Sequence, residues 1–224
     1  MAQQQPEACP AISVQALQRM PAYLVYLQTQ REEGAAFLSA AKAAQHFGLS
    51  EIQVRKDFSA ISPTPGKPKS GFAIAELIDG METFLGFRNS KDAILVGVGS
   101  LGKALLNYGG FKPYGLNIVA AFDNNPELAG KTINGKMVLP SEKISDTCRR
   151  LNIHIGVITV PAKQAQLVCD QLVAGGVKAL WNFAPAHLSV PEGVLVQNEN
   201  MAASLAILSR HLESALTPSG GMKT

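Results

Sequence analysis

The pattern of apolar and polar positions divides the chain into two parts. Over residues 13–87, apolar side chains recur at helical spacing, which predicts amphipathic helices. From residue 91 onward, short apolar runs alternate with amphipathic stretches, as they do where strands alternate with helices. Such an alternation is typical of a parallel sheet with right-handed crossovers. We therefore predict a helical domain over residues 1–86 and an α/β domain over residues 87–224.

Four helices are predicted in the first part. The first three begin after the caps Ser13, Ser39 and Ser50, and the first two of these end at about Glu33 and at Phe47. The fourth, over residues 73–87, links the two domains. Leu17, Leu24 and Leu27 share one apolar face of the first helix, in which Pro21 predicts a kink or a late start. A short helix, a turn that contains glycine and a capped helix together form the outline of a helix-turn-helix.

The third helix and the segment after it carry side chains that suit contacts with DNA. In this helix Gln53 follows Ser50 by three residues, which predicts a capping box, and Ile52 and Phe58 are expected to pack inward. The side chains free to point outward are Gln53, Arg55 and Lys56. The Pro- and Gly-rich stretch 62–71 carries Lys67 and Lys69 and suits a β-hairpin wing. A helical domain with a solvated charged face is the alternative, and it stays open at this point.

A glycine motif marks the start of the second part. An apolar strand over residues 93–96 leads into G-x-G-x-x-G, formed by Gly97, Gly99 and Gly102, and a helix follows. Gly97 allows the tight turn, Gly99 lets a pyrophosphate approach the backbone, and Gly102 lets the helix pack on the strand. The N-terminus of that helix offers N–H donors and the positive end of its dipole to the phosphates. A dinucleotide site is therefore expected here.

A carboxylate follows the second predicted strand. That strand spans residues 117–122 and ends in Asp123, where a dinucleotide-binding fold places an acid for the ribose hydroxyls. This acid favours NAD over NADP, because it repels a 2′-phosphate, and it argues against a CoA-binding domain. Later strands are expected over residues 153–160, 179–182 and 194–196, and we expect the cofactor at the carboxyl ends of the strands.

Composition narrows the class of protein. The chain has 224 residues, of which 46% are hydrophobic and 17% charged, as in a well-packed globular protein. It has no apolar run near the ~20 residues of a membrane span and no signal-peptide pattern at its N-terminus. Three scattered cysteines suggest neither a disulfide framework nor a metal site, and the net charge of +3 does not by itself indicate a nucleic-acid binder. We expect a cytoplasmic protein.

Several separate motifs, in one order, give the chain a specific resemblance. They are VRKDFS at 54–59, ILVGVGSLGKALLNYGGF at 94–111, VAAFDNNPE at 119–127, ITVPA at 158–162, NFAP at 182–185 and VPEGV at 190–194. Over roughly residues 13–216 the chain resembles the Rex family of redox-sensing transcriptional repressors. The resemblance implies a winged-helix DNA-binding domain, a Rossmann domain that binds NAD(H), and a C-terminal helix exchanged within a homodimer. It also implies a regulator, not an enzyme, that binds palindromic double-stranded operator DNA and releases it when NADH binds.

The resemblance also implies site residues. The dinucleotide contacts would be Gly97, Gly99, Ser100, Leu101, Gly102, Asp123, Thr159, Val160, Pro161, Asn182 and Phe183, with Tyr108 and Met201 near the nicotinamide. The DNA contacts would be Gln53, Arg55, Lys56, Lys67 and Lys69, with a backbone contact from Ser59. The exchanged helix would be residues 202–216, whose apolar stripe consists of Leu205, Leu208, Leu212 and Leu216. No catalytic residue and no metal ligand is expected.

Three positions depart from the family pattern. The wing contains Pro65 and Pro68, which remove N–H donors and stiffen the hairpin. Family members often pair an Arg of the first helix with an Asp of the partner's exchanged helix, and Val25 and Asn200 stand at these positions here. Met201 is more flexible than the residue usual at its position. The DNA preference and the sensing switch are therefore expected to differ from those of other members.

Three other functions stay open. A small NAD-dependent oxidoreductase is one, since Tyr108 and Lys112 have the Tyr-x-x-x-Lys spacing of short-chain dehydrogenases, although they lie too early in the chain. His187 is a possible catalytic base, although a role in stabilising its turn is the simpler explanation. The second alternative is a CoA-binding domain. The third is an NAD-binding paralogue that has lost or altered its DNA binding.

Overall fold

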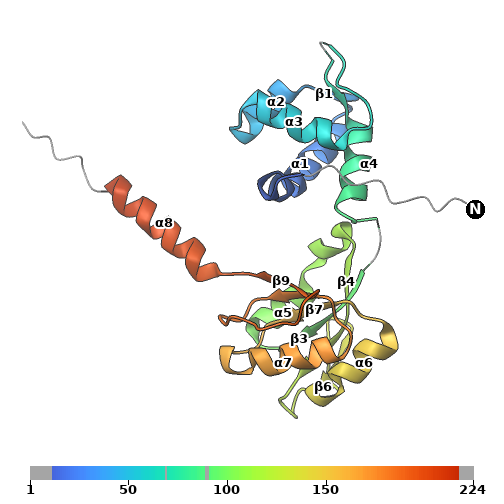
Figure 1. Cartoon of the computed structure of the whole chain (residues 1–224), viewed down its shortest axis with the longest axis vertical. Coiled ribbons are helices and arrows are strands. Elements are labelled where there is room, and N and C mark those ends of the chain that lie inside the picture. The colour runs from blue at the N-terminus through green and yellow to red at the C-terminus, as the bar shows by residue number, and fades with distance from the viewer. Residues whose placement is uncertain (1–11, 69, 89–90, 217–224) are drawn as a thin grey trace, which may run out of the picture. The chain divides into compact units, whose positions relative to one another are not determined.

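The computed structural model describes residues 12–68, 70–88 and 91–216. The chain divides into two compact units, an N-terminal unit of residues 1–89 and a C-terminal unit of residues 90–224. Figure 1 labels their helices and strands, and each unit is described by itself.

Four helices and a small sheet make up the described part of the N-terminal unit. Its elements are α1 (Val14–Glu32), β1 (Phe37–Leu38), α2 (Ala40–Phe47), α3 (Glu51–Ile61), β2 (Phe72–Ala73) and α4 (Ile74–Phe84). The predicted caps Ser13, Ser39 and Ser50 each accept a hydrogen bond from the backbone N–H three residues on, at 3.1–3.2 Å. Strands β1 and β2 pair antiparallel, and Lys67 pairs with Gly71 in the hairpin before β2. The helix-turn-helix outline and its hairpin are thus present.

Two expectations about packing were wrong. Ile52 is 72% exposed, because Val54, Phe58 and Ile61 take the core face of α3 and position 52 lies on the opposite side. Leu17 is 42% exposed, although Leu24 and Leu27 are buried as predicted.

Of the kink or late start expected at Pro21, the late start is wrong, since α1 begins at Val14 and includes the proline. Met20, Tyr23 and Leu24 beside it are fully buried. Their packing outweighs the one hydrogen bond that a proline removes from a helix. The predicted capping box is half formed, because the Gln53 amide donates to Asp57 at 2.9 Å instead of turning back to Ser50.

The C-terminal unit is a doubly wound α/β domain, as predicted. Its strands are β3 (Lys91–Val96), β4 (Leu116–Asp123), β5 (Thr132–Ile133), β6 (Lys136–Pro140), β7 (Ile155–Ile158), β8 (Ala179–Asn182) and β9 (Leu195–Asn198). Its helices are α5 (Ser100–Asn107), α6 (Ile144–Leu151), α7 (Ala162–Ala174) and α8 (Met201–Leu216), with 3-10 helices η1 (Gly109–Tyr114) and η2 (Ser141–Lys143). Ser141 begins η2, and α6 starts only at Ile144 without a side-chain cap.

The strand order is β5-β6-β4-β3-β7-β8-β9. Every pairing is parallel except that of β5 with β6. The chain therefore changes direction across the sheet between β3 and β7, and the crevice at such a point is where doubly wound folds bind ligands.

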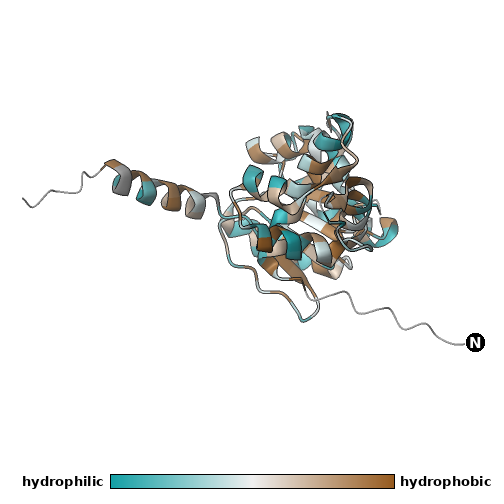
Figure 2. Ribbon diagram, turned by 90° about the horizontal axis from the view of Figure 1, so that it is seen from above, coloured by the Kyte–Doolittle hydropathy of each residue, from teal (hydrophilic) through white to brown (hydrophobic). Residues whose placement is uncertain are grey.

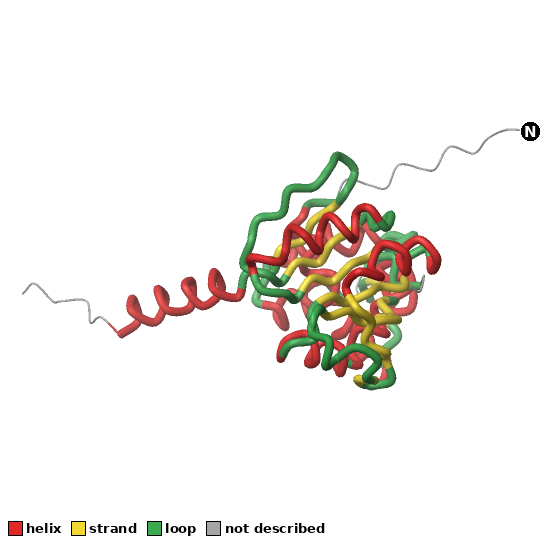
Figure 3. Tube along the Cα trace, turned by 90° about the horizontal axis from the view of Figure 1, so that it is seen from below, coloured by secondary structure: helices red, strands yellow, loops and turns green. Residues whose placement is uncertain are grey.

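Helices cover both faces of this sheet (Figure 3). Ile94 and Val96 of β3 pack in one core with Ile144 of α6 and Val168 of α7. Leu95, which points to the other face, packs with Leu106 of α5. Because alternate residues of β3 are buried on opposite faces of the sheet, the whole strand is apolar in sequence.

Helix α8 carries an exposed apolar stripe. Leu205, Leu208, Leu212 and Leu216 are between 56% and 71% exposed. Figure 2 shows hydrophobic segments recurring along this helix. In the part of the chain that the structure describes, no helix combines the length and the hydrophobicity needed to cross a bilayer.

Candidate functional site

The glycine turn between β3 and α5 is held by close backbone contacts. Gly97 has a φ of +100°, and a Cβ on it would lie 2.8 Å from the carbonyl carbon of Thr159. A Cβ on Gly102 would lie 1.9 Å from the carbonyl oxygen of Gly97. At Gly99, by contrast, no described heavy atom lies within 4 Å of an added Cβ. Gly97 and Gly102 therefore build the turn, while Gly99 leaves space in front of it.

Asp123 fixes the turn from the end of β4. Its Oδ2 accepts a hydrogen bond from the backbone N–H of Val98 at 2.6 Å, and its Oδ1 accepts one from Asn125 at 2.8 Å. Each carboxylate oxygen has a second lone pair, so the acid can still accept hydrogen bonds from a ligand.

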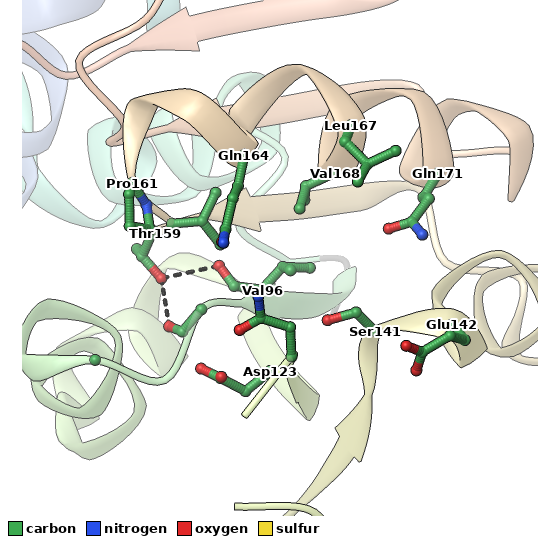
Figure 4. A pocket seen from close by; sticks show the side chains of 14 residues that line it. Val96, Asp123, Ser141, Glu142, Thr159, Pro161, Gln164, Leu167, Val168 and Gln171 are labelled. Atoms are coloured by element: carbon green, nitrogen blue, oxygen red, sulfur yellow. Dashed lines mark hydrogen bonds between the residues drawn. The ribbon is translucent and has the colours of Figure 1, made fainter. Parts of the chain in front are cut away.

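Thr159 ties the end of β7 to the same turn. Its hydroxyl lies 3.0 Å from the carbonyl oxygen of Val96 and 2.6 Å from that of Gly97, and it donates to this pair (Figure 4). The carboxyl ends of β3, β4 and β7 thus meet at one place.

A cavity of about 620 Å³ opens at this place (Figure 4). Six of the predicted dinucleotide residues line it: Gly97, Gly99, Asp123, Thr159, Val160 and Pro161. The remaining lining residues are Val96, Asn124, Ser141, Glu142, Gln164, Leu167, Val168 and Gln171. The sequence reasoning missed these, although Gln164, Leu167 and Gln171 recur at the spacing of one helix face directly after Pro161.

The other predicted dinucleotide residues lie outside this lining. Ser100, Leu101 and Gly102 form the first turn of α5. Asn182 is buried, and its amide donates to Asn198 at 2.8 Å and to the carbonyl oxygen of Ala186 at 3.0 Å. It also accepts from the N–H of Ala184, so its side chain holds the Asn-Phe-Ala-Pro turn.

Two of the predicted dinucleotide contacts, Tyr108 and Phe183, belong to a row of aromatic side chains. Tyr108, which is 57% exposed, packs on Phe111 with ring centroids 4.8 Å apart. Phe111 packs on Trp181 at 5.4 Å, and Trp181 on Phe183 at 4.9 Å. The N–H of Phe183 donates to the carbonyl oxygen of Ile158, the residue before Thr159. Met201 begins α8, and its side chain lies outside the described residues.

A second hollow lies in the N-terminal unit. This groove of about 560 Å³ runs between α3 and the hairpin, and Arg55, Ser59 and Lys67 line it together with Glu51 and Phe72. Three predicted DNA contacts therefore share one surface.

The remaining predicted DNA contacts differ in their placement. Lys56 is exposed on α3, whereas the Gln53 amide is turned toward Asp57. Lys69 lies outside the described residues. Among the described side chains no group of three His, Cys, Asp or Glu residues is placed to hold a metal ion.

Two family models match parts of this chain. A family model described as "CoA binding domain" matches residues 88–186, and one described as "Putative DNA-binding protein N-terminus" matches residues 11–59. The first covers the glycine turn and the cavity, and the second ends within α3.

Relatives match nearly the whole chain. The redox-sensing transcriptional repressor Rex of Porphyromonas gingivalis is 40% identical over 198 residues, which are 88% of this chain and 90% of the relative. That of Bacteroides fragilis is also 40% identical, over 88% and 89% of the two chains.

Solved structures agree. RSP, a Rex-family repressor, in complex with β-NAD⁺ and operator DNA has a TM-score of 0.85 at 31% identity, covering 91% of this chain and 94% of that one. Its complex with β-NADH has a TM-score of 0.82 at 31% identity, over 92% and 96%. The chain belongs to the Rex family of redox-sensing transcriptional repressors.

Proposed function

We propose that this protein binds operator DNA through the groove of its N-terminal unit and releases it when NADH occupies the cavity of its C-terminal unit. The observation that carries the proposal is that one chain joins a cation-lined helix-turn-helix groove to a glycine-turn cavity with Asp123 at its edge. Its Rex relatives are regulators, and we infer the same of this chain rather than an oxidoreductase activity. It would act where the operator DNA is, in the cytoplasm.

The cavity supports a nicotinamide dinucleotide as the ligand. The pyrophosphate would lie against Gly99 at the start of α5, where an added Cβ meets no described atom. The free lone pairs of the Asp123 carboxylate would accept hydrogen bonds from the ribose hydroxyls, and its negative charge would repel the 2′-phosphate of NADP. CoA is the competing ligand that the matched family description suggests, and its phosphorylated ribose would meet the same repulsion.

The nicotinamide would lie toward the aromatic row. Phe183 follows directly on the strand end that holds Thr159, and Tyr108 belongs to the same row of rings. An apolar enclosure favours the neutral reduced ring over the oxidised cation. Phe183→Ala is therefore expected to narrow the preference for NADH over NAD⁺.

The groove of the N-terminal unit supports DNA contacts from Arg55, Ser59 and Lys67, and Lys56 would add a phosphate contact. Gln53 reaches DNA only if its amide leaves Asp57. Because Pro65 and Pro68 stiffen the hairpin and remove N–H donors, the alternative of a paralogue that binds NAD(H) but no operator stays open.

The exposed stripe on α8 supports a dimer. Leu205, Leu208 and Leu212 are 62%, 64% and 56% exposed, and a second copy of the chain would bury them. A two-fold dimer would place two recognition helices on the half-sites of a palindrome.

One experiment tests the proposal. A palindromic duplex, selected from a random pool by the protein itself, is titrated at one fixed salt concentration with no ligand, NAD⁺ or NADH. We expect NADH to weaken DNA binding by about 1–3 kcal/mol, and operator DNA to weaken NADH binding by the same factor. Arg55→Ala is expected to abolish DNA binding and leave NADH affinity intact. Equal DNA affinity in saturating NADH and saturating NAD⁺ would show that the chain is no redox switch, and displacement of NADH by CoA would favour the competing ligand.

A further inference from the structure

The exposed face of α3 carries a carboxylate among its cationic side chains. Glu51, the first residue of α3, forms an ion pair with Arg55 one turn further on. The two side chains are 45% and 64% exposed. Both line the groove that Ser59 and Lys67 also line. If the proposed function holds, Glu51 therefore lies on the surface that meets DNA.

Folding stability accounts only weakly for a carboxylate at this position. In the first turn of α3 it gains a small stabilisation from the helix dipole and from its exposed ion pair with Arg55. Against DNA the same carboxylate is repelled by the phosphates, and it offsets part of the attraction that Arg55 and Lys67 supply. Glu51 thus lowers the affinity for a duplex unless its oxygens find a hydrogen-bond donor there.

In the major groove such donors are the N4 amino group of cytosine and the N6 amino group of adenine, so the neighbouring guanidinium must decide between them. An ionised carboxylate can only accept hydrogen bonds, whereas a guanidinium can only donate them. A G·C pair presents the O6 and N7 acceptors of guanine beside the N4 donor of cytosine. Glu51 and Arg55, held together one turn apart, present the complementary acceptor and donors. Residues at the start of a recognition helix are also those that usually reach base edges.

We propose that Glu51 is a specificity-determining residue, which reads a G·C base pair together with Arg55 and penalises pairs that present acceptors to its carboxylate. The inference rests on the proposed DNA binding. Its consequence is that Glu51 lowers affinity for most duplexes and raises discrimination among them, which is a repulsive element of recognition.

The test compares base preferences rather than affinity alone. Wild-type protein, Glu51→Gln and Glu32→Gln each select duplexes from one random pool at one salt concentration, and the bound fractions are sequenced. Glu32→Gln is the matched control, because it removes the same charge from an exposed position near the end of α1. The Glu51→Gln amide both donates and accepts, so it tolerates guanine and thymine edges.

We expect wild type and Glu32→Gln to select a cytosine at one position of each half-site. Glu51→Gln should lose the preference at this position and keep the preferences at all others. The discrimination at that position should fall by about 5- to 150-fold, which corresponds to the loss of one specific base contact. Unchanged thermal stability and NADH affinity would show that Glu51→Gln is folded.

Two results with the variants would overturn the inference. One is an unchanged selected sequence in Glu51→Gln. The other is a gain in affinity for all duplexes by the same factor in both variants, which would make Glu51 a source of general repulsion only. A wild-type protein that selects no sequence would overturn the proposed DNA binding itself, and a wild-type sequence lacking the cytosine would overturn only the role of Glu51.

Discussion

The guanidinium of Arg19 donates two hydrogen bonds to the carboxylate of Asp57, from Nε at 2.9 Å and from Nη2 at 3.1 Å. Asp57 is only 4% exposed and also accepts hydrogen bonds from the Tyr23 hydroxyl and the Gln53 amide, each at 2.9 Å. A buried carboxylate that accepts four hydrogen bonds is fully satisfied, and this one joins α1 to α3.

Removing Asp57 is expected to destabilise the protein strongly. Asp57→Ala leaves Arg19, Tyr23 and Gln53 without their acceptor, and breaking a buried pair in this way costs about 3–5 kcal/mol. Asp146→Asn is the control, because it removes an exposed carboxylate paired with Arg150, a kind of pair that contributes about 0–1 kcal/mol. Urea denaturation measures both. Equal losses in the two variants would contradict the structural role of Asp57.

Alkaline pH should weaken the same network. Burial, and then the hydrogen bond to Asp57, raises the pKa of Tyr23 to about 12 from 10.0. Between about pH 10 and pH 12 the unfolded chain therefore loses a proton that the folded chain keeps, so the free energy of unfolding falls in this window. The fall is at most about 3 kcal/mol.

Replacing Tyr23 tests this pH dependence. Tyr23→Phe should lower stability at neutral pH by about 1 kcal/mol, through the lost hydrogen bond, and reduce the loss above pH 10. Tyr26→Phe serves as the control and should keep the full alkaline loss. Urea denaturation at a series of pH values measures the free energy of unfolding of each variant. If that free energy falls above pH 10 as steeply in Tyr23→Phe as in wild type, Tyr23 is not the source of the alkaline loss.

The glycines of the turn predict a contrast between two similar substitutions. Gly99 has a φ of −72° and open space around an added Cβ, so Gly99→Ala should fold normally but place its methyl group against the pyrophosphate. Gly102→Ala would press its Cβ to 1.9 Å from the Gly97 oxygen. Overpacking of this kind costs about 1–3 kcal/mol or more.

Calorimetry with NADH and thermal unfolding separate the two variants. We expect Gly99→Ala to bind NADH at least about tenfold more weakly, a change of ~1.4 kcal/mol, at unchanged stability. Gly102→Ala should lose stability as well. If Gly99→Ala binds NADH as tightly as wild type does, the pyrophosphate does not lie against Gly99.

Neutralising Asp123 should change both the affinity for the cofactor and the choice of cofactor. Asp123→Asn keeps an oxygen acceptor but removes the charge, and a hydrogen bond to a charged group contributes about 1.5–3 kcal/mol. NADH affinity should fall by about this amount, and the discrimination against NADPH should narrow because the repulsion of its 2′-phosphate is gone. Asp146→Asn, again the charge control, should leave both affinities unchanged. An unaltered ratio of NADH to NADPH affinity in Asp123→Asn would remove the acid from the ribose site.

The two cysteines of the C-terminal unit should not sense oxidants. Cys148 and Cys169 are both fully buried, and burial raises the pKa of the Cys148 thiol to about 11 and that of Cys169 in the same direction. The thiolate is the reactive form, so both groups should be inert at neutral pH. Cys9 lies outside the described residues, and a Cys9→Ser variant isolates the buried pair. Thiol-reagent kinetics should show modification at the rate of unfolding, and rapid modification of this variant in its native state would contradict the prediction.

Local signals in the sequence determined much of the fold. Ser13, Ser39 and Ser50 predicted the three helix starts, because a serine side chain satisfies an N–H within its own turn of helix. The glycine spacing and Asp123 predicted the turn and its acid, because both follow from the local path of a βα unit. Such features depend on neighbours in the sequence, and the sequence therefore displays them.

Only the tertiary structure decided which side chains meet across the fold. The face of α7 that completes the cavity and the outward place of Ile52 both depend on elements packed from other parts of the chain. Arg19 and Asp57 are 38 residues apart, and no local pattern links them. The periodicity of side chains along the sequence predicts which residues share a face of a helix. Which of these faces is buried depends on how the helix packs in the whole core.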